Sequence, residues 1–345
     1  MFLFLRRNTF NFCCRFVVNV LLNYQARSVV KRGMRFGYAC INTTLADDNV
    51  TVNRSMVKRT FLEKGISYAS QLALMNVTDL EKIIDWNITN RLLLYRLSSD
   101  MFPWMSEYEI SQLPDYPAIS ARLRSIGEKV RHSHLRLTFH PGPFNVLASP
   151  DDRVIGRTIK ELRQHAEIMD LLLLQRSPFS KINIHVGGAY GDRKSALQRF
   201  IKNFSQLPPE VSSRLTVEND DKANMFSVAD LLIVHDATGI PIVFDYHHHF
   251  FRSGDLTHEE ALSLACETWP KHITPIVHYS SSRKIFEDPS SAEASHADFL
   301  YEPIDRYGFN LDIMLEAKAK EKATLRFIDE MTRWEKTRTT TNPPA

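Results

Sequence analysis

The sequence has few cysteines and no long apolar run. Its four cysteines, Cys13, Cys14, Cys40 and Cys266, form neither a C-x-x-C pair nor the pattern of a disulfide framework. The longest apolar stretch, around Phe16–Leu22, is too short to span a bilayer. These absences argue against a disulfide-stapled secreted domain and against a membrane protein. They favour a reducing compartment inside the cell, the cytoplasm or the nucleus.

Acidic residues are missing from residues 1–46, which hold seven Lys or Arg. Residues 1–33 resemble a mitochondrial presequence or a weak signal peptide, or they are a translated extension upstream of a functional start at Met34. We treat them as a non-globular leader, and the mitochondrion is the address if they are a presequence. Six of the 43 basic residues lie in this leader, which leaves 37 against 40 acidic residues in the rest of the chain. Any affinity for a polyanion must therefore come from local patches or bound metal.

Eight short apolar segments alternate with amphipathic ones. This rhythm predicts an α/β protein of one domain, a TIM (β/α)8 barrel over residues 34–334 that is followed by a disordered tail at 335–345. The predicted strands are Arg35–Ile41, Arg91–Leu97, Leu135–His140, Lys181–Val186, Arg214–Glu218, the stretch that begins at Ile240, Ile273–His278 and Phe309–Met314. Between the first two strands we expect two helices, Ser55–Met75 and Val77–Trp86, with Thr78 and Asp79 at the start of the second.

Imidazole or carboxylate side chains follow five of these strands where each strand ends. The clearest case is Ile240–Phe250, IPIVFDYHHHF, in which a β-branched run ends in Asp245, Tyr246, His247, His248 and His249. The other four strands end at His140, His185, Glu218 and His278. A single such His is more often a hydrogen-bonded residue than a ligand, but five strands with the same ending reverse that preference. The C-terminal ends of barrel strands meet at one mouth, so we expect a metal site there.

The mixture of imidazole and carboxylate suits Mn, Zn or Fe, whereas carboxylates alone would suit Mg or Ca. Two or three such ions, about 3.5 to 4 Å apart, clamp the attacking and leaving oxygens of a phosphodiester and generate hydroxide near neutral pH. Such a site needs no side-chain nucleophile.

Nine motifs in a fixed order resemble the UV damage endonuclease family, which is similar to endonuclease IV in its barrel and trinuclear metal centre. They are GYACIN (37–42), RLSSD (96–100), FHPG (139–142), HVGGAYGD (185–192), ENDD (218–221), FDYHHH (244–249), HYSSSR (278–283), HADF (296–299) and DIMLEAK (312–318). The resemblance implies a metal-dependent endonuclease that cuts double-stranded DNA 5′ to UV photoproducts. It also implies two or three divalent ions per chain, with Mn ahead of Zn and Mg, and a monomer.

The resemblance implies eight metal ligands in three sites. They are His140, His185 and Glu218 in the first, a bridging Glu218 with Asp245, His278 and Glu316 in the second, and His248 with His296 in the third. The three carboxylates are the implied catalytic residues.

The resemblance also implies contacts with DNA. Tyr38 and Asn42 match positions that approach the lesion, where stacking on an aromatic ring does not depend on sequence. Hydroxyl and guanidinium groups commonly position the phosphate backbone. The candidates for this role are Ser98, Ser99, Ser281, Ser282 and Arg283.

Two positions depart from the family pattern. After FHPG the family usually has Gln and an aromatic residue, but here Pro143 and Phe144 follow. Phe144 keeps an apolar wedge that can open a base stack, without the polar half of the probe, so we expect a changed lesion range. Two residues before His278, Ile276 replaces a Lys near the metals, and we expect a weaker third site.

Three other functions stay open on the sequence. An abasic-site endonuclease of the endonuclease IV type shares the barrel and the metals. A sugar isomerase shares the barrel and a His and carboxylate site, but it does not account for the ordered motifs. A non-catalytic protein that binds damaged DNA would have no use for a bridging carboxylate.

Overall fold

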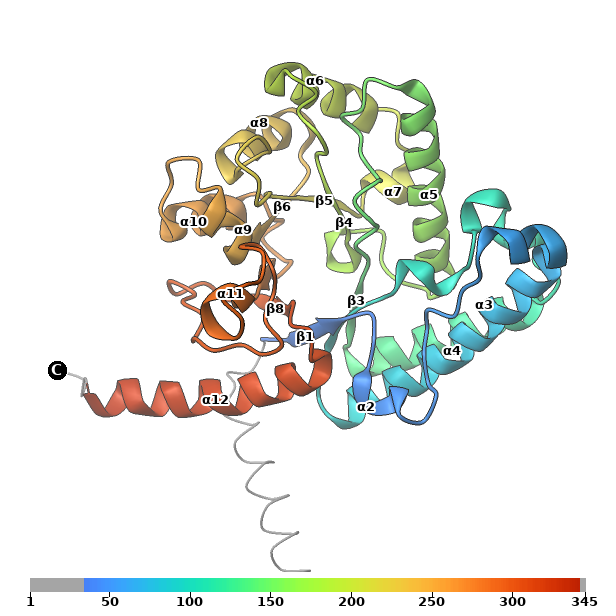
Figure 1. Cartoon of the computed structure of the whole chain (residues 1–345), viewed down its shortest axis with the longest axis horizontal. Helices are drawn as coiled ribbons and strands as arrows, with labels where there is room; N and C mark the ends of the chain where they lie inside the picture. The colour runs from blue at the N-terminus through green and yellow to red at the C-terminus, as the bar shows by residue number, and fades with distance from the viewer. Residues whose placement is uncertain (1–33, 342–345) are drawn as a thin grey trace, which may run out of the picture.

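The computed structural model describes the backbone of residues 34–341 as eight parallel strands surrounded by helices (Figure 1). The strands are β1 (Phe36–Ala39), β2 (Leu94–Arg96), β3 (Arg136–Thr138), β4 (Ile182–His185), β5 (Leu215–Glu218), β6 (Ile242–Asp245), β7 (Ile276–Tyr279) and β8 (Asp312–Leu315). Their order in the sheet is β3-β2-β1-β8-β7-β6-β5-β4. The predicted TIM barrel is therefore confirmed. The leader expected at 1–33 lies outside the described residues.

The barrel closes between β3 and β4 through a parallel bridge that pairs Phe139 with Ile182. Phe139 N donates to Lys181 O, and Asn183 N donates to Phe139 O, each at 2.9 Å. All strand pairs are parallel, so the eight C-terminal ends face one mouth. Side chains at these ends converge although they are far apart in the chain.

Helices surround the barrel and bury their apolar faces against its strands, as Leu80, Phe200 and Phe327 show by being fully buried. The helices are α2 (Thr43–Ala46), α3 (Lys58–Thr89), α4 (Tyr116–Ser133), α5 (Asp152–Leu171), α6 (Arg193–Phe204), α7 (Pro209–Ser212), α8 (Val228–Thr238), α9 (Tyr246–Phe251), α10 (His258–Glu267), α11 (Arg283–Phe286) and α12 (Lys320–Thr341), with short 3-10 turns η1 (Ser99–Met101), η2 (Met105–Glu107), η3 (Ile110–Gln112) and η4 (Pro178–Ser180). Within residues 34–341, no helix has the length and apolar character needed to cross a membrane.

Two helix predictions need correction. Residues 58–89 form one element, α3, whose helical geometry is interrupted at Gly65 with φ of 65°, a conformation that glycine adopts without strain. Thr78 does not cap a second helix, because its hydroxyl donates to Leu74 O at 2.7 Å within α3. At the other end of the chain α12 runs to Thr341, so residues 335–341 continue a helix instead of belonging to a disordered tail.

Candidate metal centre and active site

Asp245 ends β6 and fixes the turn into α9. Its Oδ1 accepts a hydrogen bond from His248 N at 2.8 Å, which makes Asp245 the N-cap of α9. Asn219 holds the backbone of Asp245 on both sides, since its Oδ1 accepts from Asp245 N at 2.9 Å and its Nδ2 donates to Asp245 O at 3.0 Å. The cap brings the His248 side chain back over the strand ends.

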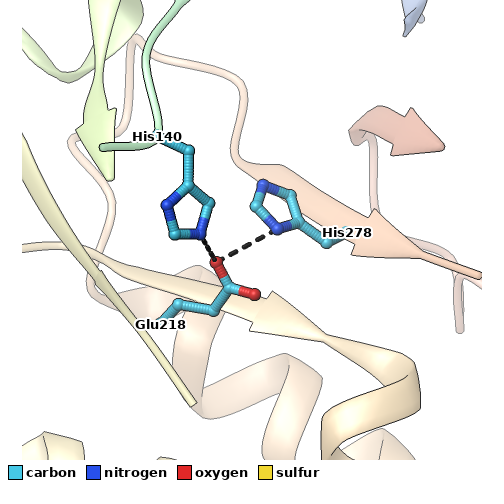
Figure 2. A group of neighbouring side chains, drawn as sticks. All are labelled: His140, Glu218 and His278. Carbon is cyan, nitrogen blue, oxygen red and sulfur yellow. Dashed lines mark hydrogen bonds and ion pairs between the residues drawn. The ribbon is translucent and has the colours of Figure 1, made fainter. Parts of the chain in front are cut away.

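Glu218 lies at the centre of the mouth and is 1% exposed. Its Oε2 lies 3.1 Å from His140 Nε2 and 3.1 Å from His278 Nδ1, and both rings point at this one oxygen (Figure 2). Its Oε1 lies 3.3 Å from His248 Nδ1. One carboxylate therefore faces three imidazoles from different elements, which is the arrangement that a bridging ligand requires.

The ligand atoms form three groups in which all atoms lie within 4.8 Å of one another. The groups are His140, Glu218 and His278; His185, Glu218 and His248; and Asp245, His278 and Glu316. Seven of the eight expected ligands are thus brought together. The grouping differs from the expected one, because His140 shares Glu218 with His278, and His185 shares Glu218 with His248.

His296 is the expected ligand outside these groups. Its Nδ1 faces the backbone Glu316 O at 2.8 Å and lies 3.8 Å from Glu316 Oε2. Because a carbonyl oxygen can only accept, Nδ1 carries a proton, and Nε2 is the ring nitrogen that is left to face an ion. His296 therefore remains beside the centre in the tautomer of a ligand.

Two buried atoms indicate that the residues fit a cation. Asp245 Oδ2 and His278 Nδ1 are buried and make no hydrogen bond to any described residue. A buried polar atom left unpaired costs about 1–3 kcal/mol. Both atoms belong to the group with Glu316, so a divalent ion held there would satisfy both.

The electrostatics of the mouth also suit cation binding. Burial lowers the pKa of His140 to about 4, so its imidazole is neutral at pH 7. Burial opposes the charged form of His185 as well, but the Glu218 and Asp220 carboxylates raise its pKa to about 9. Burial would raise the pKa of Glu218, but the nearby imidazoles, His278 first, hold it well below its usual range. Glu218 is therefore ionised throughout the neutral range.

The family follows from comparison with known proteins. A family described as UV-endonuclease UvdE matches residues 34–343. The chain belongs to the UV DNA damage endonuclease family. A UV DNA damage endonuclease of Bacillus cereus (strain G9842) is 33% identical over 305 residues, 86% of this chain and 94% of the relative. The UV-damage endonuclease of Schizosaccharomyces pombe is 34% identical over 301 residues, 84% of this chain and 49% of that protein. The crystal structure of SacUVDE has 30% identity and a TM-score of 0.76, and the match covers 88% of this chain and 99% of that one.

Three further side chains in this UV DNA damage endonuclease fold reach the centre and were not predicted. Arg96, the last residue of β2, forms an ion pair with Glu316. Asn183 donates a hydrogen bond to Glu218 Oε2 and is itself held by Thr216, whose hydroxyl donates to Asn183 Oδ1 at 2.7 Å. The third is Lys181, described next.

Lys181 is fully buried, and its Nζ lies 3.2 Å from His278 Nε2. Burial lowers the pKa of Lys181 to about 7. A buried lysine is thus present although Ile276 stands in β7, and it comes from the position directly before β4. The alternation of Lys181, Asn183 and His185 along one strand is a sequence signal for three side chains on one face.

The residues expected to contact DNA fall into two classes. Phe144 is 88% exposed in the loop after β3, and Arg283 is partly exposed, with Nη1 at 3.8 Å from Asp298 Oδ1. Tyr38 and Asn42, in contrast, are buried. Asn42 Nδ2 donates to the Tyr38 hydroxyl at 2.9 Å, and that hydroxyl donates to Asn87 at 2.7 Å. These two side chains link β1 to α3 in this structure, and their contact with DNA stays a prediction.

The serines around the mouth support its loops. Ser98 Oγ accepts from Asp100 N at 3.2 Å, and Ser281 Oγ accepts from Tyr301 N at 3.1 Å. Ser99 Oγ lies 3.0 Å from His165 Nε2. Ser282 is buried at the start of α11. Ser98, Ser281 and Ser282 are therefore buried within the protein, whereas Phe144 is exposed and Ser99 and Arg283 are partly exposed.

Proposed function

We propose that the protein is a metal-dependent endonuclease that hydrolyses the phosphodiester 5′ to UV photoproducts in double-stranded DNA. The observation that carries the proposal is the buried Glu218, which faces imidazoles from three elements at the mouth of a UV DNA damage endonuclease barrel. Asp245 Oδ2 and His278 Nδ1, which are buried among carboxylates and imidazoles without a hydrogen bond to a described residue, add to it.

We assign two or three divalent ions, Mn first, to the three groups of ligand atoms around Glu218, with His296 as a further ligand. When bound, such ions supply a hydroxide near neutral pH and stabilise the leaving 3′ oxygen. The protein's part is to hold the ligands. Asn183 fixes Glu218, and Asn219 fixes the backbone of Asp245. Asp220 Oδ1 lies 3.0 Å from His185 Nδ1 and orients that ring.

We assign to Phe144 the opening of the base stack at the lesion. Its ring is exposed in the loop that follows His140, and an inserted apolar side chain unstacks a base step. The variant Phe144→Ala is expected to bind a dimer-containing duplex about tenfold more weakly, since base stacking on an aromatic contributes about 1–3 kcal/mol. A matched control is Ile233→Ala, because Ile233 is 54% exposed on α8. Equal loss in both variants, measured by fluorescence anisotropy, would contradict the assignment.

The decisive experiment uses a duplex with one pyrimidine dimer, incubated with the protein and Mn. The expected product is a single nick 5′ to the dimer. Intact strands under every metal condition overturn the proposal. An abasic duplex is assayed side by side, because Pro143 in place of Gln leaves the lesion range open, and cutting of that duplex alone shows an abasic-site endonuclease. Tight binding that a chelator does not change, with no product, shows a damage-binding protein.

A further inference from the structure

Arg96 differs from the other buried arginines of the barrel. Arg136 uses all three side-chain nitrogens, donating to the carbonyls of Phe179, Thr274 and Pro178 and to Asp312. Arg214 likewise engages all three nitrogens, with the Asp170 carboxylate and backbone carbonyls. These two arginines are saturated, which is what a structural role requires.

Arg96 is not saturated. Among the described residues, its side chain has one hydrogen-bond partner, Glu316 Oε1, which it reaches through Nη1. The Arg96 side chain is 15% exposed, whereas those of Arg136 and Arg214 are 0% exposed. Nε and Nη2 therefore have donors to offer at the mouth, next to a predicted metal ligand.

The charge of Arg96 is secure. A guanidinium stays protonated in proteins at neutral pH, and Arg96 is already paired with the Glu316 carboxylate. The centre otherwise presents three carboxylates, Glu218, Asp245 and Glu316, which repel a phosphate. A fixed guanidinium beside them offsets that repulsion, and its planar fork matches two oxygens of a phosphate.

We propose that Arg96 binds a non-bridging oxygen of the scissile phosphate and is a catalytic residue of this centre. The inference rests on the proposed function, which defines the scissile linkage as the one 5′ to the dimer. Glu316 holds Nη1 in place, and the remaining donors take the phosphate. The pairing with Glu316 therefore pre-positions Arg96 before DNA arrives.

The test is a double-mutant cycle between protein and DNA. Two dimer duplexes are compared, one with a neutral methylphosphonate at the scissile linkage, and affinities are measured with chelator present so that no strand is cut. The wild-type protein should bind the methylphosphonate duplex roughly tenfold more weakly. Arg96→Gln should bind the normal duplex about as weakly as the wild-type protein binds the methylphosphonate duplex. Its affinity for the methylphosphonate duplex should be no lower than its affinity for the normal one. The slope of log K against log salt should fall by about 0.9 in this variant.

Controls separate this role from others. Arg176→Gln, at the opposite end of the barrel, should keep the wild-type cycle and salt slope. Arg96→Gln should keep the wild-type Mn stoichiometry in calorimetry, and loss of Mn shows instead that Arg96 only positions Glu316. If Arg96→Gln does not fold, Arg96→Lys is used, and its methylphosphonate penalty should be smaller than that of the wild type because Lys has no fork.

A wild-type salt slope and methylphosphonate penalty in Arg96→Gln overturn the inference, as does the full wild-type penalty in Arg96→Lys. Because the cycle is measured without cutting, it reports on Arg96 even if the wild-type protein fails to nick the dimer duplex. That failure would overturn the proposed function separately.

Discussion

At the N-terminal end of the barrel, Arg136 and Asp312 form a fully buried ion pair at 2.8 Å, which Arg35 extends at 3.1 Å. The Arg136 guanidinium also lies 4.7 Å from the centre of the Phe179 ring. At the C-terminal mouth, Asp245 Oδ2 and His278 Nδ1 are equally buried but have no hydrogen-bond partner. Both ends place charge inside one barrel, yet only the N-terminal end is complete without further ligands.

The same strands therefore carry residues that stabilise the fold at their N-terminal ends and residues of the proposed active site at their C-terminal ends. β3 carries Arg136 at its start and leads to His140, and β8 carries Asp312 at its start and leads to Glu316. At the strand starts, Arg136 and Asp312 have their hydrogen bonds satisfied within the protein, and their ion pair joins β3 to β8. At the strand ends, Asp245 Oδ2 and His278 Nδ1 have no hydrogen-bond partner among the described residues, and we propose that bound ions satisfy them. Mutations at the two ends should therefore fail in different ways.

Glu218→Gln tests the mouth with the largest expected effect. The substitution preserves size but removes the central charge, and we expect incision of a dimer duplex to fall by roughly three orders of magnitude, since several kcal/mol of charge stabilisation depend on the ions it holds. Single-turnover rates with Mn measure the loss. Circular dichroism should show a folded protein. A partly exposed acid on α7 provides the control, Glu210→Gln, which should cut like the wild type.

Arg136→Met tests the opposite end. Removing one partner of a buried pair leaves Asp312 undercompensated and three carbonyls without a donor, so we expect the free energy of unfolding to fall by about 3–5 kcal/mol. Urea unfolding measures it. The double variant Arg136→Met with Asp312→Leu should recover much of the loss. A loss below about 1 kcal/mol would contradict a structural role for this pair.

Added Mn should raise the free energy of unfolding through the residues of the mouth, and independently of the Arg136 ion pair at the other end. At a free concentration 100 times Kd, a ligand that binds only the folded state contributes about 2.7 kcal/mol. The wild-type protein and Arg136→Met should gain equally in urea unfolding with Mn against chelator, because Arg136 is far from the ligands. Glu218→Gln should gain less. Equal gains in all three proteins would place the Mn elsewhere.

Glu81→Gln should give the smallest effect. It removes a surface ion pair, so its loss of unfolding free energy is a reference for the variants at the two ends of the barrel. Glu81 on α3 receives Lys129 at 2.9 Å and Arg122 at 2.7 Å, and Lys129 foremost lowers the pKa of Glu81. A lowered pKa adds stability above the unfolded value of about 4.3, and this stability is lost as pH falls through the folded value. We expect the variant to lose about 0.5 kcal/mol at pH 7 and nothing at about pH 2. A loss that persists in acid would show that charge is not its cause.

The barrel and its ligands could be predicted because both depend on local patterns. Each apolar run is short, and most of the ligands stand directly at strand ends, so parallel pairing alone brings them to one mouth. The pairing among ligands could not be predicted, because it depends on how far each side chain reaches across the mouth. His248 illustrates this, since the short helix α9 that carries it was not expected.

Other misses have separate causes. Tyr38 lies on β1, and period-two alternation does not say which face of a strand points into the barrel and which points toward the helices. In the structure its hydroxyl reaches Asn87 of α3. The break in α3 lies at Gly65, where φ is positive, and not at the polar residues near 76–79. Arg96 belongs to the RLSSD motif and ends the buried strand β2. A charged residue in that position is a signal for a side chain at the mouth, and the predicted site does not include it.

The joint between β3 and β4 has a consequence for dynamics. Only a short bridge around Phe139 closes the sheet there, while His140 and His185 stand on its two sides and both approach Glu218. Ions bound by these histidines would cross-link β3 and β4 beside this bridge. Amide hydrogens of Phe139 and Asn183 should therefore exchange with deuterium faster than those of the other strands, and Mn should slow them most.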